Sequence, residues 1–210
     1  MASIQYGNGG INHLAPRLST RRLVAFNHRP WPYVGEQNYM GSSARRNRMA
    51  RRIADVNNSN IGILCNGRCN ADILARETAR FYQERHQCTV AEFIDKELPT
   101  EPCQAEQLLS LSKVCDFLIT AIGDSECSSA SILEDSIRFE QYGKPAIVVC
   151  TKPFVSAARH AAGEMGLPDY PFVAVDHPVA GISSSELTDR ALHAYRQGMA
   201  YLTGVYLLIG

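Results

Sequence analysis

The sequence predicts an α/β domain with a doubly wound, mostly parallel sheet of about five strands and helices on both faces. From about residue 60 onward, short continuous apolar runs alternate with segments in which apolar residues recur at helical spacing. Strands that are buried on both faces are typical of parallel sheets covered by helices. We therefore assign residues 60–210 to the α/β domain and residues 1–59 to a basic, irregular N-terminal arm.

The expected strands are IGILC, CTVAEFI, DFLITAI, PAIVVC and PFVAVD. The first helix is expected in NADILARETARFYQERH, with Asn70 as its N-cap. The second lies in TEPCQAEQLLSLSK and starts near Thr100, and the third lies in SASILEDSIRFEQYG and is closed by Gly143. A fourth is expected in PFVSAARHAAGEMG, and the last begins with the capping box Ser183-x-x-Glu186.

The N-terminal arm is rich in Gly, Asn, Pro and Arg, and one helix, Ser43–Ile53, is expected in it. No acidic residue precedes Glu36. A solvated surface is the simplest interpretation of the arginines. The alternatives are an organelle-targeting presequence and an arm that packs on a partner subunit. The arginines concerned are residues 17, 21, 22, 29, 45, 46, 48, 51 and 52.

The chain is neutral overall, with 21 basic and 21 acidic residues. Such a balance gives no electrostatic reason to expect nucleic acid or an acidic membrane as the main partner. The apolar tail MAYLTGVYLLIG is too short to span a bilayer, so it indicates a docked helix end or a partner contact. We expect no nucleic acid and no membrane, and a homo-oligomer formed through the arm or this tail.

Seven cysteines are scattered through strand-like and apolar runs. An odd number in such positions, without an apolar leader after the first methionine, favours free thiols in a reducing, cytoplasmic compartment. Cys65 and Cys69 lack a second pair at zinc-finger spacing, so we expect no metal. GNGG precedes no strand-to-helix unit, and we expect no nucleotide or other cofactor.

Polar and reactive residues follow four of the expected strands. The carboxyl ends of parallel strands meet at one edge of the sheet, and ligands bind in the crevice there. The sequence therefore predicts a small-molecule site at this edge. The residues concerned are Asn66, Arg68 and Cys69 after the first strand, Asp124, Ser125, Glu126, Cys127 and Ser128 after the third, Thr151 and Lys152 after the fourth, and Asp176 and His177 after the fifth.

The candidate catalytic residues are Cys127, His177, Asp124 and Glu126. Cys127 lies just before or inside the first turn of a helix, where the dipole favours an anion and a thiol becomes a better nucleophile. The alternative is a small buried cysteine in a tight turn. His177 ends a strand beside a rigid proline and is suited to proton transfer. Asp124 and Glu126 are either a general acid and base or a helix cap and a first-turn carboxylate.

The candidate substrate-binding residues share the same edge. Ser125 and Ser128 are either helix caps or donors to a substrate carboxylate. Arg68 and Lys152 are suited to holding an anion. The full set expected to bind substrate is Ser125, Ser128, Asn66, Arg68, Cys69, Thr151 and Lys152.

Three segments resemble the UGSC-motif family: NIGILCNGRCNAD, CDFLITAIGDSECSSASILEDSIRFEQYGKPAIVVCTKPFV and GLPDYPFVAVDHPVAGISSSEL. The layout is also distantly similar to the selenoprotein B subunit of glycine, sarcosine and betaine reductases. The resemblance implies a strand-end selenol or thiol, with a second thiol nearby, that attacks a small substrate covalently. In its U-G-S-C motif, U is selenocysteine or a cysteine that replaces it.

This chain departs from the U-G-S-C motif. Without a gap, Ser125 takes the U position and Ser128 the final cysteine position. Shifted by one residue, Cys127 keeps the final cysteine and Asp124 replaces U. In either register the redox pair is broken. The sequence therefore favours a non-redox small-molecule enzyme of isomerase, lyase, cyclase or hydrolase type, acting on an anionic or carbonyl substrate. The alternatives are a non-catalytic binding or assembly subunit and a thiol reductase that pairs Cys127 with Cys65, Cys69 or Cys150.

Overall fold

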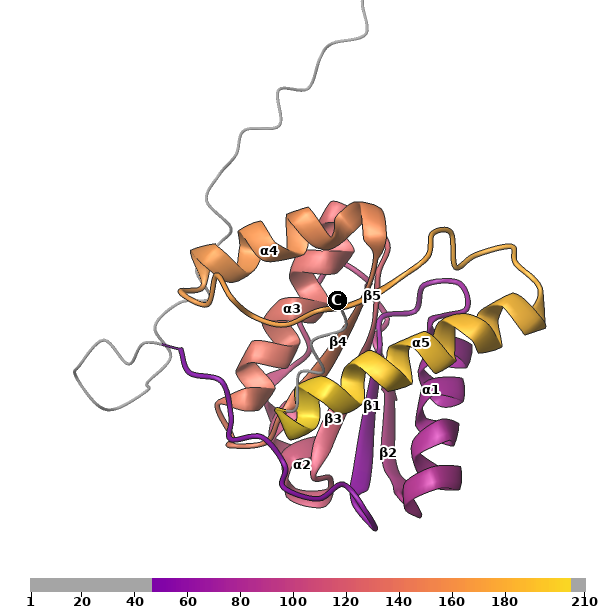
Figure 1. Ribbon diagram of the computed structural model, residues 1–210. Coiled ribbons are helices and arrows are strands. Elements are labelled where there is room, and N and C mark those ends of the chain that lie inside the picture. The colour runs from indigo at the N-terminus through magenta and orange to yellow at the C-terminus, as the bar shows by residue number, and fades with distance from the viewer. Residues whose placement is uncertain (1–46, 205–210) are drawn as a thin grey trace, which may run out of the picture. The chain divides into compact units, whose positions relative to one another are not determined.

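The computed structural model describes residues 47–204. They contain one sheet of five parallel strands in the order β2-β1-β3-β4-β5 (Figure 1). The predicted doubly wound α/β fold is confirmed. The strands are β1 (Asn60–Cys65), β2 (Thr89–Asp95), β3 (Phe117–Gly123), β4 (Ala146–Thr151) and β5 (Val173–Val175).

Helices cover both faces of the sheet. Helices α1 and α5 pack on one face, and α2, α3 and α4 pack on the other (Figure 1). A short 3₁₀ turn, η1 (Lys152–Phe154), joins β4 to α4. The α-helices are α1 (Ala71–His86), α2 (Ala105–Val114), α3 (Glu126–Glu140), α4 (Val155–Glu164) and α5 (Ser184–Thr203).

Strand β3 shows why the central strands are apolar without alternation. Phe117 and Ile119 belong to the core beneath α1 and α5, whereas Leu118, between them, belongs to the core beneath α2 and α3. Successive side chains of a strand point to opposite faces, so a strand covered on both faces needs apolar residues at every position. Strand β2 lies at the edge of the sheet, and several of its residues are exposed.

The helix ends correct several details of the prediction. Ser183 and Glu186 form the expected capping box. Asn70 precedes α1, but its side-chain amide donates to the carbonyl oxygen of Val179 instead of capping the helix. Helix α2 begins at Ala105, later than expected, and α3 begins at Glu126, three residues before the expected start. The early start of α3 follows from the cap that Ser125 provides.

The helix predicted over Ser43–Ile53 is wrong for the part that the structure describes, because residues 47–53 contain no helix. Their backbone groups find partners elsewhere in the fold. The amide of Ala50 donates to Glu140 Oε2 at 2.6 Å, and the amide of Ile53 donates to the carbonyl of Leu202 at 2.7 Å. Arg52 forms an ion pair with Glu140 at 2.8 Å. Residues 50–53 therefore pack on α3 and α5, and residues 1–46 of the predicted arm lie outside the described residues.

The strand order creates a topological switch point between β1 and β3. After β1 the chain enters α1 on one face, and after β3 it enters α3 on the other. The loops that leave these two neighbouring strands therefore diverge at the carboxyl edge, and ligands bind at such a switch point in open α/β sheets. Arg68 lies in one of these loops, and Asp124 lies in the other.

Candidate functional site

Arg68 crosses the switch point and joins the two loops. Its Nη2 donates to Ser125 Oγ at 3.0 Å, and its Nε lies 3.2 Å from Asp124 Oδ1 in an ion pair. Both side chains are partly exposed, at 37% for Arg68 and 20% for Asp124. The structure thus brings together residues predicted from two strands, and the Arg68 side chain remains partly exposed although its Nε is buried.

The hydroxyls of Ser125 and Ser128 both serve the start of α3. Ser125 Oγ accepts the amide of Ser128 at 3.2 Å and donates to Ser128 Oγ at 2.8 Å. Ser128 Oγ accepts the amides of Asp124 at 3.1 Å and Ser125 at 3.0 Å, and it lies 3.0 Å from Asp124 Oδ1. Ser128 is fully buried. Apart from the hydrogen bond that Ser125 Oγ accepts from Arg68, the contacts of both hydroxyls lie within the turn, so this cap positions the helix and its first-turn side chains.

Gly123 allows α3 to begin directly against the sheet. A Cβ at this position would lie 2.6 Å from Ser129 Oγ and 2.7 Å from Cys150 Sγ. Real Cβ atoms do not approach neighbours so closely, so any larger residue would displace β4 or the first turn of α3. The glycine of the Gly-Asp turn is therefore required by close packing, which brings the N-terminus of α3 to the strand ends.

Asn66 holds the end of β3 from the neighbouring loop. Its Oδ1 accepts the amide of Ile122 at 3.1 Å, and its Nδ2 donates to the Ile122 carbonyl at 2.9 Å. The peptide bond between Ala121 and Ile122 is cis. Asn66 is fully buried. The sequence predicts Asn66 to contact substrate. In the structure its side chain is bonded to the backbone of Ile122 and holds the end of β3.

The ends of β4 and β5 meet the same turn. Thr151 is fully buried, and its Oγ1 donates to the Gly123 carbonyl at 3.2 Å. His177 Nδ1 lies 3.3 Å from the same hydroxyl, and the imidazole packs edge-on against Phe154, with ring centroids 5.7 Å apart. His177 itself is exposed. Two polar contacts therefore link His177 through Thr151 to the turn that precedes Cys127.

Cys127 and Glu126 are exposed in the first turn of α3. All seven cysteines are free thiols, and Cys69 and Cys127 are the exposed ones. Burial raises the pKa of the Cys65 thiol, and it raises that of Cys150 to about 12. Because a thiolate is the reactive form, both buried thiols are poor nucleophiles at neutral pH. Cys69 lies in the loop after β1 and Cys127 lies in the helix that follows β3, so the exposed thiols follow the two strands that border the switch point.

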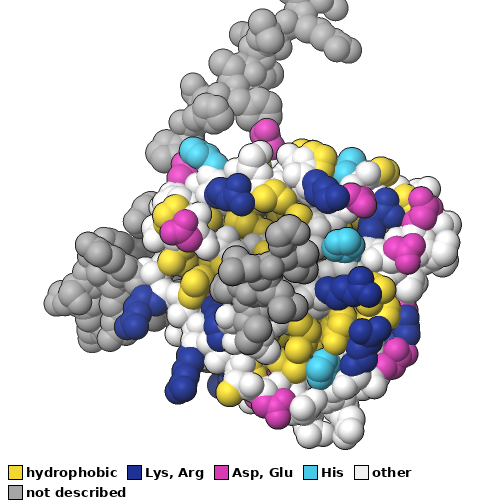
Figure 2. Space-filling view, viewed as in Figure 1, with side chains coloured by type: hydrophobic (Ala, Val, Ile, Leu, Met, Phe, Trp, Pro, Cys, Tyr) yellow, Lys and Arg dark blue, Asp and Glu magenta, His cyan; other side chains and the backbone are white. Residues whose placement is uncertain are grey.

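Lys152 lines a separate hollow formed by the end of β5 and the first half of α5. Its Nζ lies 2.6 Å from Asp176 Oδ1, and both side chains are about two-thirds exposed, at 64% and 65%. Hydrogen bonding to Lys152 lowers the pKa of Asp176. Basic, acidic and histidine side chains are interspersed on the face shown in Figure 2. The hollow has a volume of about 280 Å³ and is lined by Lys152, Ala174, Val175, Asp176, Glu186, Asp189, Arg190 and His193.

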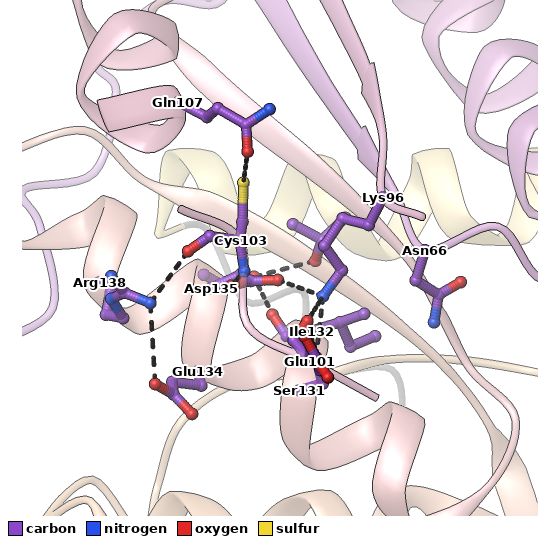
Figure 3. A network of polar contacts seen from close by, with 12 residues as sticks. Asn66, Lys96, Glu101, Cys103, Gln107, Ser131, Ile132, Glu134, Asp135 and Arg138 are labelled. Atoms are coloured by element: carbon purple, nitrogen blue, oxygen red, sulfur yellow. Dashed lines mark hydrogen bonds and ion pairs between the residues drawn. The ribbon is translucent and has the colours of Figure 1, made fainter. Parts of the chain in front are cut away.

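A buried ion pair, Lys96–Asp135, was missed by the sequence analysis (Figure 3). Lys96 follows β2, and its Nζ donates to Asp135 Oδ2 at 2.6 Å, Ser131 Oγ at 2.8 Å and the Glu101 carbonyl at 2.7 Å. The other Asp135 oxygen accepts the Cys103 amide at 2.6 Å. This network fastens the β2–α2 connection to α3. The sequence does hold one sign of this ion pair: Asp135 occurs among the buried residues of α3, between Ile132 and Phe139, where an aspartate needs a partner.

Among residues 47–204, no cluster of three or more histidine, cysteine, aspartate or glutamate side chains is arranged to hold a metal ion. No helix in this part of the chain is long and apolar enough to cross a membrane.

The fold and the gathered side chains define a doubly wound α/β protein with polar and reactive groups at its switch point. The UGSC family model matches residues 31–204, so the chain belongs to the UGSC family. No curated protein matches it.

Two solved structures are similar to this chain at low identity. A diflavin flavoprotein A3 from Nostoc sp. is 15% identical, with a TM-score of 0.40, and the match covers 69% of this chain and 94% of that one. Translation elongation factor SelB from Methanococcus maripaludis, in complex with a GTP analogue, is 14% identical, with a TM-score of 0.33. That match covers 69% of this chain but 35% of the elongation factor. At these scores the likenesses say nothing about function.

Proposed function

We propose that this protein is an enzyme that acts on a small anionic or carbonyl-bearing molecule by non-redox chemistry of the isomerase, lyase, cyclase or hydrolase type. The observation that carries this proposal is a set of contacts that connects the ends of β1, β4 and β5 to the turn after β3. Arg68 reaches Asp124 and Ser125 from β1, and Thr151 links His177 to Gly123 from β4 and β5.

Cys127 acts as the nucleophile or as an acid and base in this proposal. It is exposed in the first turn of a long helix, where backbone N–H groups favour negative charge on a bound molecule. His177 and the carboxylates of Asp124 and Glu126 transfer protons. Arg68 orients an anionic group by charge-assisted hydrogen bonds, for which it exchanges part of its contact with Asp124.

Non-redox chemistry is favoured by the positions of the two serines. In the ungapped register of the family motif, Ser125 and Ser128 take the places of the selenol and the final thiol. Their hydroxyls are used to cap α3. A reductase mechanism needs a second accessible thiol; of the three partners considered for Cys127, Cys65 and Cys150 are buried, and Cys69 is the exposed one.

The experiment is a protection assay on the full chain. Cys127 and Cys69 are alkylated with neutral iodoacetamide in the presence of a panel of small carboxylates and carbonyl compounds, and each site is quantified by peptide mass spectrometry. We expect at least one compound to slow alkylation of Cys127 while Cys69, the internal control, is unaffected. Arg68→Gln should weaken protection by carboxylates about tenfold, as expected for the loss of a charge-assisted hydrogen bond.

Compounds that protect are then incubated with the wild-type chain and with Cys127→Ala and His177→Ala, and products are followed by NMR. Turnover in the wild type that is lost in both variants supports the assigned roles. Full turnover in either variant, or no compound that protects Cys127 more than Cys69, contradicts the proposal.

A thiol reductase that uses Cys127 with Cys69 is the second candidate, because these are the two exposed thiols and they follow the two strands that border the switch point. Mild oxidation followed by thiol titration separates the two functions. The reductase requires the joint loss of both accessible thiols, whereas the non-redox enzyme keeps them titratable.

A non-catalytic binding or assembly subunit is the third candidate, since the Arg68 guanidinium is already paired with Asp124. We further propose a homo-oligomer in the cytoplasm, with contacts through the N-terminal arm or the apolar tail. Both regions lie largely outside the described residues. Light scattering with and without residues 1–59 tests the arm, and a monomer in both cases would count against it.

A further inference from the structure

The Thr151 hydroxyl lies within hydrogen-bonding distance of a carbonyl oxygen and of an imidazole nitrogen. On one side is the Gly123 carbonyl, 3.2 Å from Oγ1, and on the other is His177 Nδ1, at 3.3 Å. Thr151 is fully buried, so its hydroxyl is shielded from bulk solvent and from any ligand at the switch point. The sequence predicts Thr151 to bind substrate, but its position allows it to act only through its neighbours.

The number of hydrogens decides the direction of these contacts. A threonine hydroxyl has one hydrogen, and a carbonyl oxygen can only accept. When the hydroxyl donates to Gly123, it can only accept from the imidazole, so Nδ1 of His177 must carry the ring proton. In the neutral imidazole the other nitrogen, Nε2, then holds the lone pair.

We propose that Thr151 is a positioning residue that holds His177 in the Nδ1–H tautomer, with the Nε2 lone pair available to accept a proton. This inference rests on the proposed function, in which His177 transfers protons. The hydrogen bond fixes the tautomer, and the edge of the Phe154 ring limits rotation of the imidazole. A buried hydroxyl with its own acceptor thereby performs the orienting task that a carboxylate or carbonyl performs for many catalytic histidines.

The same contact also ties the histidine to the nucleophile's turn. Gly123, whose carbonyl accepts from Thr151, directly precedes Asp124 and the cap of α3. A shift of the β3–α3 turn would therefore be transmitted to His177 through one hydroxyl. His177 and the first turn of α3 are thus positioned relative to each other by Thr151, although they follow strands β5 and β3, which are not adjacent in the sheet.

The test is long-range ¹H–¹⁵N NMR of the ¹⁵N-labelled full chain at a pH where His177 is neutral, with its signals assigned by comparison with His177→Ala. The pattern of cross-peaks distinguishes the two neutral tautomers. We expect the Nδ1–H pattern in the wild type and in Thr151→Ser, which keeps the hydroxyl. Thr151→Val, which keeps the shape and removes the hydroxyl, should lose that pattern.

A wild-type spectrum with the Nε2–H pattern overturns the inference, and so does an unchanged tautomer in Thr151→Val. If Thr151→Val does not fold, the wild-type and Thr151→Ser spectra still decide, because both must show the Nδ1–H pattern. The readout needs no substrate. A correct tautomer with no protection of Cys127 would therefore refute the proposed function and leave the role of Thr151 standing.

Discussion

Helix α3 carries two polar regions that differ in almost every physical respect. At its N-terminus, Cys127 and Glu126 are exposed beside the partly accessible Arg68–Asp124 pair. Two turns further on, Asp135 and its partner Lys96 are almost completely buried, with side chains 0% and 5% exposed. The first region offers groups to a ligand, whereas the second has every strong donor used within the protein. One helix thus connects a candidate reactive site to an internal anchor.

Exposure separates the polar groups available to a ligand from those that hold this fold together. A buried ion pair contributes little net stability relative to apolar residues, but it is costly to break because the remaining charge has no solvent. An exposed pair is weak and easily replaced by a ligand. Substitutions should therefore affect stability at the anchor and ligand binding at the helix N-terminus.

The largest expected effect comes from breaking the anchor. Lys96→Met leaves Asp135 buried without its cation, and we expect the free energy of unfolding to fall by about 3–5 kcal/mol. Burial already raises the pKa of Asp135, with Lys96 opposing the rise, so the variant should take up a proton at that carboxyl. Urea denaturation measures the loss.

The matched control is Lys152→Met, which removes a lysine from an ion pair of the same 2.6 Å length that is mostly exposed. It should leave the urea midpoint nearly unchanged. Equal losses in the two variants would show that burial does not distinguish the two ion pairs.

A smaller effect is expected at Gly123. The Gly123→Ala methyl would meet Ser129 and Cys150 at 2.6 and 2.7 Å, and overpacking of this kind costs about 1–3 kcal/mol. In Gly163→Ala, within α4, the new methyl would meet nothing within 4 Å. That variant should gain about 0.5–1 kcal/mol from helix propensity. Thermal unfolding of the two variants tests whether the turn at Gly123 is tightly packed. Destabilisation by both substitutions would argue against an effect specific to packing at Gly123.

The smallest effect concerns the buried thiol behind the same turn. Burial raises the pKa of Cys150 from 9.0 to about 12, so the folded state keeps a proton that the unfolded state releases above pH 9. The unfolded state binds fewer protons there, and stability must fall as pH rises. We expect Cys150 to account for about 1 kcal/mol of the loss between pH 9 and pH 10.

Cys150→Ala should therefore show a shallower decline of unfolding free energy over this interval, measured by urea denaturation at each pH. Identical slopes in Cys150→Ala and the wild type would mean that this thiol is not desolvated in the folded chain.

Most of the fold could be predicted because each central strand is buried on both faces. Continuous apolar runs such as DFLITAI indicate this burial. The alternation of such runs with helices in turn indicates parallel strands. The start of α3 and the coil at residues 47–53 were predicted incorrectly. Both depend on specific partners: the cap formed by Ser125 and Ser128, and the contacts with Glu140 and Leu202.

Apolar periodicity and the order of elements are local properties of the chain, so they sufficed to predict the class of the fold and the edge at which polar residues collect. The surroundings of each polar residue at that edge are set by the tertiary fold. It buried Asn66 and Thr151, used the hydroxyls of Ser125 and Ser128 in a cap, and left Cys127 exposed. Lys96 and Asp135 lie far apart in the sequence but meet inside the protein. The physical reason is that hydrogen-bond partners and desolvation are set by neighbours from other strands and helices, which no local pattern records.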